Sequence, residues 1–135
     1  MIVIDTSAVL AILFEEPEAE AFMTRIVEAE SPAMSAVSVL EAGLVMAGRG
    51  GGPAQWTLFD ALLQDARVDV VAFDSAQATL ARRAFLHYGR GRHPAGLNFV
   101  DCASYALAAA KGWPLLFKGE DFVRTDIPPA LGLAC

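Results

Sequence analysis

The sequence is poor in cysteine: its 135 residues include only Cys102 and Cys135. Two cysteines do not make a disulfide framework, so we expect a reduced, cytoplasmic setting. A zinc site is not indicated either, because His87 and His93 have no cysteine or histidine at ligand spacing. The chain must fold on its hydrophobic core alone. A length of 135 residues with 55% hydrophobic content is sufficient for that.

Long hydrophobic runs are also missing. The longest stretch without a charged residue is ten residues, whereas a membrane-spanning helix needs about 20 apolar residues. The apolar N-terminus has no basic residue before it and is interrupted by Asp5, so we expect no signal peptide. We therefore predict a globular protein that does not associate with membranes.

Basic residues are in the minority. Lysine and arginine number 10 against 16 acidic residues, which gives a net charge of −6. This balance argues against a general nucleic-acid-binding protein. Residues 75–100 nevertheless contain no acid and four arginines, Arg82, Arg83, Arg90 and Arg92. This basic segment either binds an anionic partner or is a solvated helix face and loop.

Short apolar runs alternate with longer helical patterns along the chain. The predicted strands are residues 2–4, 33–37, 68–73 and 115–117, and the tail from residue 125 could add another. The predicted helices are residues 8–14, 18–30, 38–47, 54–66, 75–88 and 98–111. The sequence thus predicts an α/β fold: a single domain over residues 1–135, with a central parallel sheet of four to five strands and helices on both faces. We expect Leu40, Leu44 and Val45, together with Trp56 and Trp113, to face the core.

Acidic residues stand close to the predicted strand ends. Asp5 directly follows the first strand, and Glu41 lies one helical turn after the second. Asp101 begins the helix before the fourth strand, and Asp121 follows that strand. Active sites of parallel α/β sheets lie beyond the C-terminal strand ends, so we expect these four carboxylates to converge. Converging acids repel one another unless a cation lies between them, and hard oxygen ligands suit Mg²⁺ or Mn²⁺.

The same acids have a structural interpretation as parts of helix caps. The candidates are Asp5 as an N-cap, Ser38 with Glu41 as a capping box, and Asn98 with Asp101 as another cap. Asp121 could be an ordinary turn residue, and we interpret Asp74, after the third strand, as a cap only. Capping does not explain why the first, second and fourth strands would each bring an acid to one edge of the sheet.

Four segments resemble, in order, the acidic motifs of the PIN domain family. They are residues 3–8 (Val-Ile-Asp-Thr-Ser-Ala), 38–42, 93–102, and 115–122 with 125–127. Within that family the chain is similar to the VapC-like toxins of bacterial toxin–antitoxin pairs, from Ile2 to Ile127. The resemblance implies a divalent-metal-dependent endoribonuclease acting as a toxin, with Mg²⁺ or Mn²⁺ as cofactor. It also implies an antitoxin protein as partner, and a homodimer.

The resemblance assigns roles to individual residues. The implied catalytic and metal-binding set is Asp5, Glu41, Asp101 and Asp121, with Glu41 acting directly or through a water. Thr6 would support the site by donating its hydroxyl to a carboxylate or a phosphate. Asn98 would support it by orienting Asp101, or would simply cap the helix. The four arginines of the basic segment would contact RNA phosphates.

Two other functions remain open from the sequence. A phosphoacceptor receiver-like domain has a similar length and alternation, and Asp74 and Lys118 superficially match its phosphorylated aspartate and its lysine. A receiver needs two adjacent acids after its first strand, however, and here Thr6 follows Asp5. The remaining alternative is a catalytically silent module that only binds an antitoxin, against which the presence of all four acids argues.

Overall fold

The computed structural model describes residues 1–131 and contains a four-stranded parallel sheet with strand order β3-β2-β1-β4. The elements in chain order are β1 (Ile2–Ile4), α1 (Thr6–Leu13), α2 (Ala19–Glu28), β2 (Pro32–Ser35), α3 (Ala36–Gly48), α4 (Gly52–Asp65), β3 (Asp69–Val71), α5 (Ser75–Tyr88), α6 (Phe99–Lys111), β4 (Leu115–Leu116) and a 3₁₀ helix, η1 (Phe122–Arg124). The predicted α/β class and the parallel sheet are confirmed.

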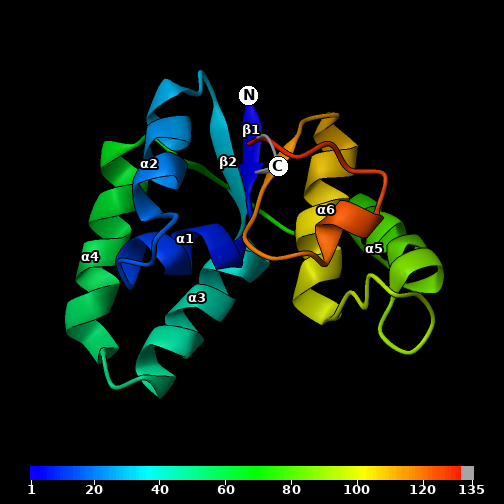
Figure 1. Cartoon of the computed structure of the whole chain (residues 1–135), viewed down its shortest axis with the longest axis horizontal. Coiled ribbons are helices and arrows are strands. Elements are labelled where there is room, and N and C mark those ends of the chain that lie inside the picture. Colours follow the sequence, from blue (N-terminus) through cyan, green and yellow to red (C-terminus); the bar gives the residue numbers. More distant parts are fainter. Residues whose placement is uncertain (132–135) are drawn as a thin grey trace.

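Helices cover both faces of this sheet, as the sequence predicts. Figure 1 shows α1 to α4 on one side of β1 and β2, and α5 and α6 on the other. Successive side chains of a strand point to opposite faces, so Ile2 and Ile4 of β1 pack into the first layer and Val3 into the second. In β4, Leu116 joins the first core and Leu115 the second. The C-terminal ends of the strands are therefore framed by helices from both layers.

The segment after η1 returns to the sheet but forms less than the additional strand we considered. Leu115 and Pro129 form an isolated parallel bridge, and the Ala130 amide donates to the Leu115 carbonyl at 2.8 Å. The end of that predicted strand, with Cys135, lies outside the described residues. None of the helices within residues 1–131 combines the length and hydropathy needed to span a bilayer.

Helix α3 differs from the prediction in its start and in its buried face. It begins at Ala36 with Ser35 as N-cap, so Ser38 and Glu41 do not form a capping box. Its buried side chains are Ser38, Ala42 and Met46. Leu40 and Leu44 are 62% and 61% exposed, and our prediction that they face the core is wrong. A helix with apolar residues on every side does not reveal its inner face, and here small side chains let α3 approach its neighbours closely.

Candidate active site

Asp5 stands where β1 ends and α1 begins, and its carboxylate is almost completely buried. It is the N-cap of α1: Oδ2 accepts a hydrogen bond from the Ser7 amide at 3.0 Å and another from the Ser7 hydroxyl at 2.6 Å. Its other oxygen, Oδ1, accepts from the Ser104 hydroxyl of α6 at 2.6 Å. The capping role considered from the sequence is thus correct, and the same carboxylate also contacts a second helix.

Glu41 lies in the second turn of α3 and is partly buried. Burial, the largest effect, raises its pKa, the neighbouring Thr6 side chain lowers it, and the negative charge of Asp5 raises it further. The Thr6 hydroxyl donates to the Ser38 carbonyl at 3.3 Å. Thr6 is buried at the first position of α1, so this bond ties the start of α1 to α3, three residues before Glu41.

The pKa of Asp101 is affected by each of the other three predicted acids. Burial, the largest effect, raises the pKa of its carboxyl group to about 6, against the opposing effect of a hydrogen bond from the Asn98 backbone. The negative charges of Asp5, Asp121 and Glu41 each raise it as well. The other three predicted carboxylates are therefore close enough to act on Asp101 at the C-terminal edge of the sheet.

Asn98 and Asp101 form a capping box at the start of α6. The Asn98 side-chain oxygen accepts from the Asp101 amide at 2.9 Å, and Asp101 Oδ2 accepts from the Asn98 amide at 3.0 Å. The Asn98 side chain therefore contacts the backbone of Asp101 and not its carboxylate. The cap that the sequence indicates is present, and one oxygen of Asp101 is held by it.

Asp121 differs from the other three acids because it is exposed and makes no capping bond to η1. Its neighbour Glu120 is paired at 4.0 Å with Arg124. Asp74, the acid that follows β3, is the N-cap of α5 and accepts from the Gln77 amide at 2.9 Å. Of the acids near Asp101, Asp121 acts on its pKa, whereas Glu120 and Asp74 do not appear among the charges that shift it.

The donor set fits a hard divalent cation. Within residues 1–131, no three His, Cys, Asp or Glu side chains are arranged to hold one metal ion in the present geometry. Mg²⁺ needs fewer protein ligands than that, because it usually keeps several waters and takes one or two carboxylates. Two of the acids, Asp5 and Asp101, are largely buried and mutually repulsive, and a cation between them would relieve the repulsion.

Three serines of this region were not predicted as site residues: Ser7, Ser38 and Ser104. Ser104 lies three residues after Asp101, and Ser38 lies three before Glu41, so each shares a helix face with an acid. Ser7 lies two residues after Asp5. That spacing is the only sequence signal for them.

The basic segment lies on α5 and on the loop that follows it. Its four predicted RNA-binding residues, Arg82, Arg83, Arg90 and Arg92, are all exposed. None of them is among the groups that shift the pKa of Glu41 or Asp101. The structure therefore places the arginines outside the carboxylate cluster, where they do not neutralise it.

The chain belongs to the PIN domain family, whose model matches residues 2–128. It is similar to Ribonuclease VapC30 of Mycobacterium tuberculosis strain H37Rv, with 51% identity over 125 residues that cover 93% of this chain and 95% of the relative. It is also similar to Ribonuclease VapC of Mycolicibacterium smegmatis, with 50% identity over 93% of this chain and 96% of the relative.

Solved structures show the same fold at lower sequence identity. The M. tuberculosis toxin VapC20, described as cleaving the sarcin–ricin loop, matches with a TM-score of 0.75 at 16% identity, over 94% of this chain and 96% of that chain. A toxin–antitoxin complex from Klebsiella pneumoniae matches with a TM-score of 0.70 at 14% identity, over 93% of both chains.

These comparisons confirm the predicted class, a PIN-domain endoribonuclease of the VapC-like toxin type. Membership of this family excludes the receiver-like alternative. The strand order agrees, because β1 lies between β2 and β4 here, whereas the flavodoxin-like order 2-1-3-4-5 places β1 beside β3.

Proposed function

We propose that this PIN-domain ribonuclease hydrolyses RNA phosphodiester bonds with Mg²⁺ or Mn²⁺ held directly by Asp5 and Asp101 and through a water by Asp121, as the cytoplasmic toxin of a toxin–antitoxin pair. The observation that carries the proposal is the placement of Asp5, Glu41 and Asp121 around Asp101: burial is the main cause that raises the pKa of Asp101 to about 6, and the charges of these three acids add to it. When bound, the metal supplies an activated water and stabilises negative charge on the phosphoryl oxygens.

The chain's own residues hold and orient the reacting groups. Asp5 is fixed by hydrogen bonds to both of its oxygens, so it offers a rigid ligand to the cation. Glu41, supported by Thr6, completes the set directly or through a water. The raised pKa of Glu41 also suits it to accept a proton from the attacking water.

RNA needs cations outside the acidic cluster, since carboxylates repel its phosphates. Arg82 and Arg83 line the hollow between α5 and α6 that we assign below to a second copy, so the exposed Arg90 and Arg92 of the following loop are the arginines suited to contact RNA phosphates. Substituting them is expected to weaken RNA binding and its salt dependence while metal binding remains unchanged.

An antitoxin partner is supported by the VapC-type relatives and by the toxin–antitoxin complex of similar fold. The exposed apolar surface formed by Leu40 and Leu44 of α3 with Trp56 of α4 fits such a partner. A shallow hollow of about 240 Å³ lies there, and the Trp56 indole donates to the Gly43 carbonyl at 2.8 Å. Apolar surface of this kind is typical of protein interfaces.

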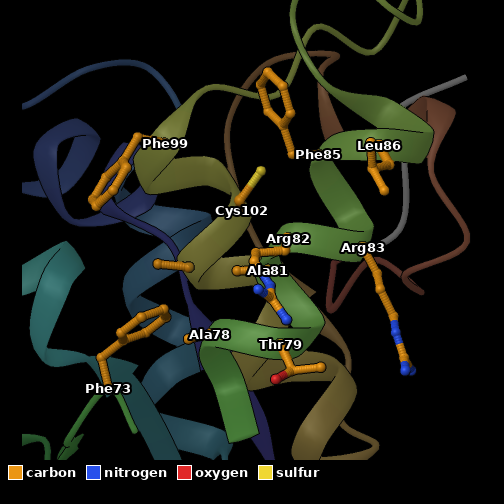
Figure 2. A pocket seen from close by; sticks show the side chains of 11 residues that line it. Phe73, Ala78, Thr79, Ala81, Arg82, Arg83, Phe85, Leu86, Phe99 and Cys102 are labelled. Atoms are coloured by element: carbon orange, nitrogen blue, oxygen red, sulfur yellow. The ribbon is translucent and has the colours of Figure 1, made fainter. Parts of the chain in front are cut away.

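We assign a second copy of the chain to the larger hollow between α5 and α6, about 750 Å³ in volume. Figure 2 shows Phe73 and Phe99 along one side of it and Phe85 and Leu86 on another. Leu86 is 61% exposed and Phe99 79% exposed, so a dimer would cover costly apolar surface. A Leu86→Glu variant should sediment as a monomer where the unchanged protein sediments as a dimer.

Metal-dependent cleavage is the direct test of the proposed function. Purified protein, freed of any bound partner, is incubated with a mixed RNA pool with and without Mg²⁺ or Mn²⁺. Asp121→Asn is the informative variant, because Asp121 is exposed and makes no capping bond, so its loss should not affect folding. We expect cleavage to fall at least a hundredfold in this variant.

The matched control is Glu120→Gln, which removes a neighbouring exposed acid with the same charge. It should keep nearly full activity. Equal cleavage by Asp121→Asn and the unchanged protein would contradict the assigned site. Cleavage that persists in EDTA would contradict the metal requirement.

A further inference from the structure

A continuous network of hydrogen bonds runs through the interior beside the carboxylates. The hydroxyls of Ser38 and Ser104 lie 3.0 Å apart, and Ser104 donates to Asp5 Oδ1 at 2.6 Å. On the other side, Ser7 donates to Asp5 Oδ2 at 2.6 Å and accepts from the Lys118 amide at 2.9 Å. Ser38 and Ser104 are both completely buried, so no solvent competes for these bonds.

This network of hydrogen bonds joins the four segments that carry the acids. Asp5 belongs to the network, and each of the other acids lies three residues along the sequence from a residue of the network. The pairs are Ser38 with Glu41, Ser104 with Asp101, and Lys118 with Asp121. Movement of one segment would therefore disturb the bonds that position the others.

The direction of the bonds follows from the single hydrogen of each hydroxyl. Ser104 uses its hydrogen on Asp5, so the 3.0 Å contact requires Ser38 to be the donor to Ser104. Ser7 likewise uses its hydrogen on Asp5 and can only accept from the Lys118 amide. Every donor in the network thus points either at the Asp5 carboxylate or at a hydroxyl that itself donates to Asp5.

The two carboxylate oxygens of Asp5 accept different numbers of hydrogen bonds. Oδ2 accepts two hydrogen bonds, from the amide and the hydroxyl of Ser7, and both of its lone pairs are used. Within residues 1–131, Oδ1 accepts one bond, from Ser104, and keeps a lone pair. A cation bound by Asp5 would therefore bind Oδ1, the oxygen that Ser104 orients.

We propose that Ser104 is a positioning residue that directs Asp5 Oδ1 toward the catalytic cation. Ser38 fixes the Ser104 hydroxyl by donating a hydrogen bond to it. This inference rests on the proposed metal-dependent function. Ser104 does not touch the metal or the RNA in this assignment. Its hydroxyl fixes the carboxylate rotation, as groups that hydrogen-bond metal ligands commonly do.

The test measures Mn²⁺ affinity directly by calorimetric titration, without RNA. Ser104→Ala is expected to weaken Mn²⁺ binding at least tenfold, because the carboxylate loses the donor that orients Oδ1. Ser104→Thr keeps the hydroxyl and should bind within about threefold of the unchanged protein. Thermal unfolding of each variant shows that it is folded.

Ser35→Ala is the matched control. Ser35 is equally buried and caps α3 by accepting a hydrogen bond from the Val37 amide, but it does not belong to the network that includes Ser104. Its loss should lower stability by removing a cap and leave Mn²⁺ affinity unchanged. A variant that merely loosens the fold would behave like this control.

Near-equal Mn²⁺ affinity in Ser104→Ala and the unchanged protein would overturn the positioning role while leaving the proposed function intact. Absence of Mn²⁺ binding in the unchanged protein would overturn both. If Ser104→Ala does not fold, Ser104→Val serves in its place, since valine has the shape of the threonine variant without its hydroxyl. Mn²⁺ affinity in Ser104→Val that matches the unchanged protein would equally overturn the positioning role.

Discussion

At the scale of single residues, Asp5 performs two tasks with one carboxylate. Its Oδ2 closes the start of α1 through Ser7, and its Oδ1 faces the helix that carries Asp101. A cap at the end of a central, buried strand is held more rigidly than a cap at the surface. The structural and the chemical interpretation of this acid are therefore compatible, because helix starts and strand ends coincide at this edge of the sheet.

Asp101 carries the clearest electrostatic cost of the site, and we predict that Asp101→Asn stabilises the fold at pH 8 by about 1 kcal/mol. Its folded-state pKa, about 6, lies above the ordinary value of 3.8. The folded state thus binds the proton more tightly, so the stabilising contribution is complete below about pH 4 and lost as the pH rises through 6. Asparagine keeps the capping acceptor and has no charge to bury.

Urea unfolding of both proteins at pH 8, 6 and 4, in EDTA, measures this difference. The gain from Asp101→Asn should be largest at pH 8 and shrink toward zero at pH 4. Glu28→Gln, at an exposed position of α2, is the control and should change stability by less than about 0.5 kcal/mol at each pH. A gain from Asp101→Asn that does not vary with pH would contradict the assignment of the raised pKa.

At the scale of elements, α5 and α3 show when local sequence is sufficient. The helix predicted over residues 75–88 occurs with those bounds, because Asp74 is an unambiguous cap and Gly89 follows the last turn. For α3 the Ser38 and Glu41 pair imitates a capping box, yet β2 runs directly into the helix and Ser35 caps it. The competition between two possible caps was decided by where the strand ends.

Helix α6 offers a test that separates capping from metal binding. We predict that Asn98→Ala destabilises the protein by about 1 kcal/mol, since the Asp101 amide loses its partner. Mn²⁺ affinity should change by less than about threefold, because Asp101 Oδ2 is held by the Asn98 backbone, which the variant retains. Chemical unfolding and Mn²⁺ titration of the same preparation measure the two quantities.

Asn98→Ser is the matched control for that helix. Serine is an equally good N-cap residue, so stability should return to nearly that of the unchanged protein. A large loss of Mn²⁺ affinity in Asn98→Ala but not in Asn98→Ser would show that the cap also orients the Asp101 carboxylate, contrary to the prediction.

At the scale of the whole molecule, two hydrophobic layers enclose the sheet, so we expect folding not to depend on the metal. A ligand that binds only the folded state adds about 2.7 kcal/mol at a concentration one hundred times its dissociation constant. We predict that saturating Mn²⁺ raises the melting temperature by roughly 10 °C, and that the protein in EDTA remains folded.

Differential scanning fluorimetry across a Mn²⁺ series checks this prediction. Asp101→Asn should start from a higher melting temperature at pH 8 and respond less to Mn²⁺, because it lacks both the repulsion and a ligand. Loss of the folded state in EDTA, or an identical Mn²⁺ response in the two proteins, would contradict the assigned site.

The sequence by itself determined the alternation of strands and helices and the PIN-type acidic motifs, and it supplied the prediction that four carboxylates form one site. Those features depend on local periodicity, caps and residue order, and they are readable without tertiary contacts. The inner face of α3 could not be read, because apolar residues surround that helix and Leu40 and Leu44 are left exposed. Trp56, expected in the core, is 42% exposed for the same reason: its place depends on how α4 packs against α3.

Only the tertiary structure decided how the carboxylates are held. Ser38 and Ser104 are 66 residues apart in the sequence, and Ser104 reaches Asp5 across 99 residues. No local pattern specifies such contacts, because they depend on where separate helices meet over the sheet. A buried hydroxyl needs a hydrogen-bond partner, and the packing of α3 and α6 over the sheet brought these two serines to each other and to Asp5.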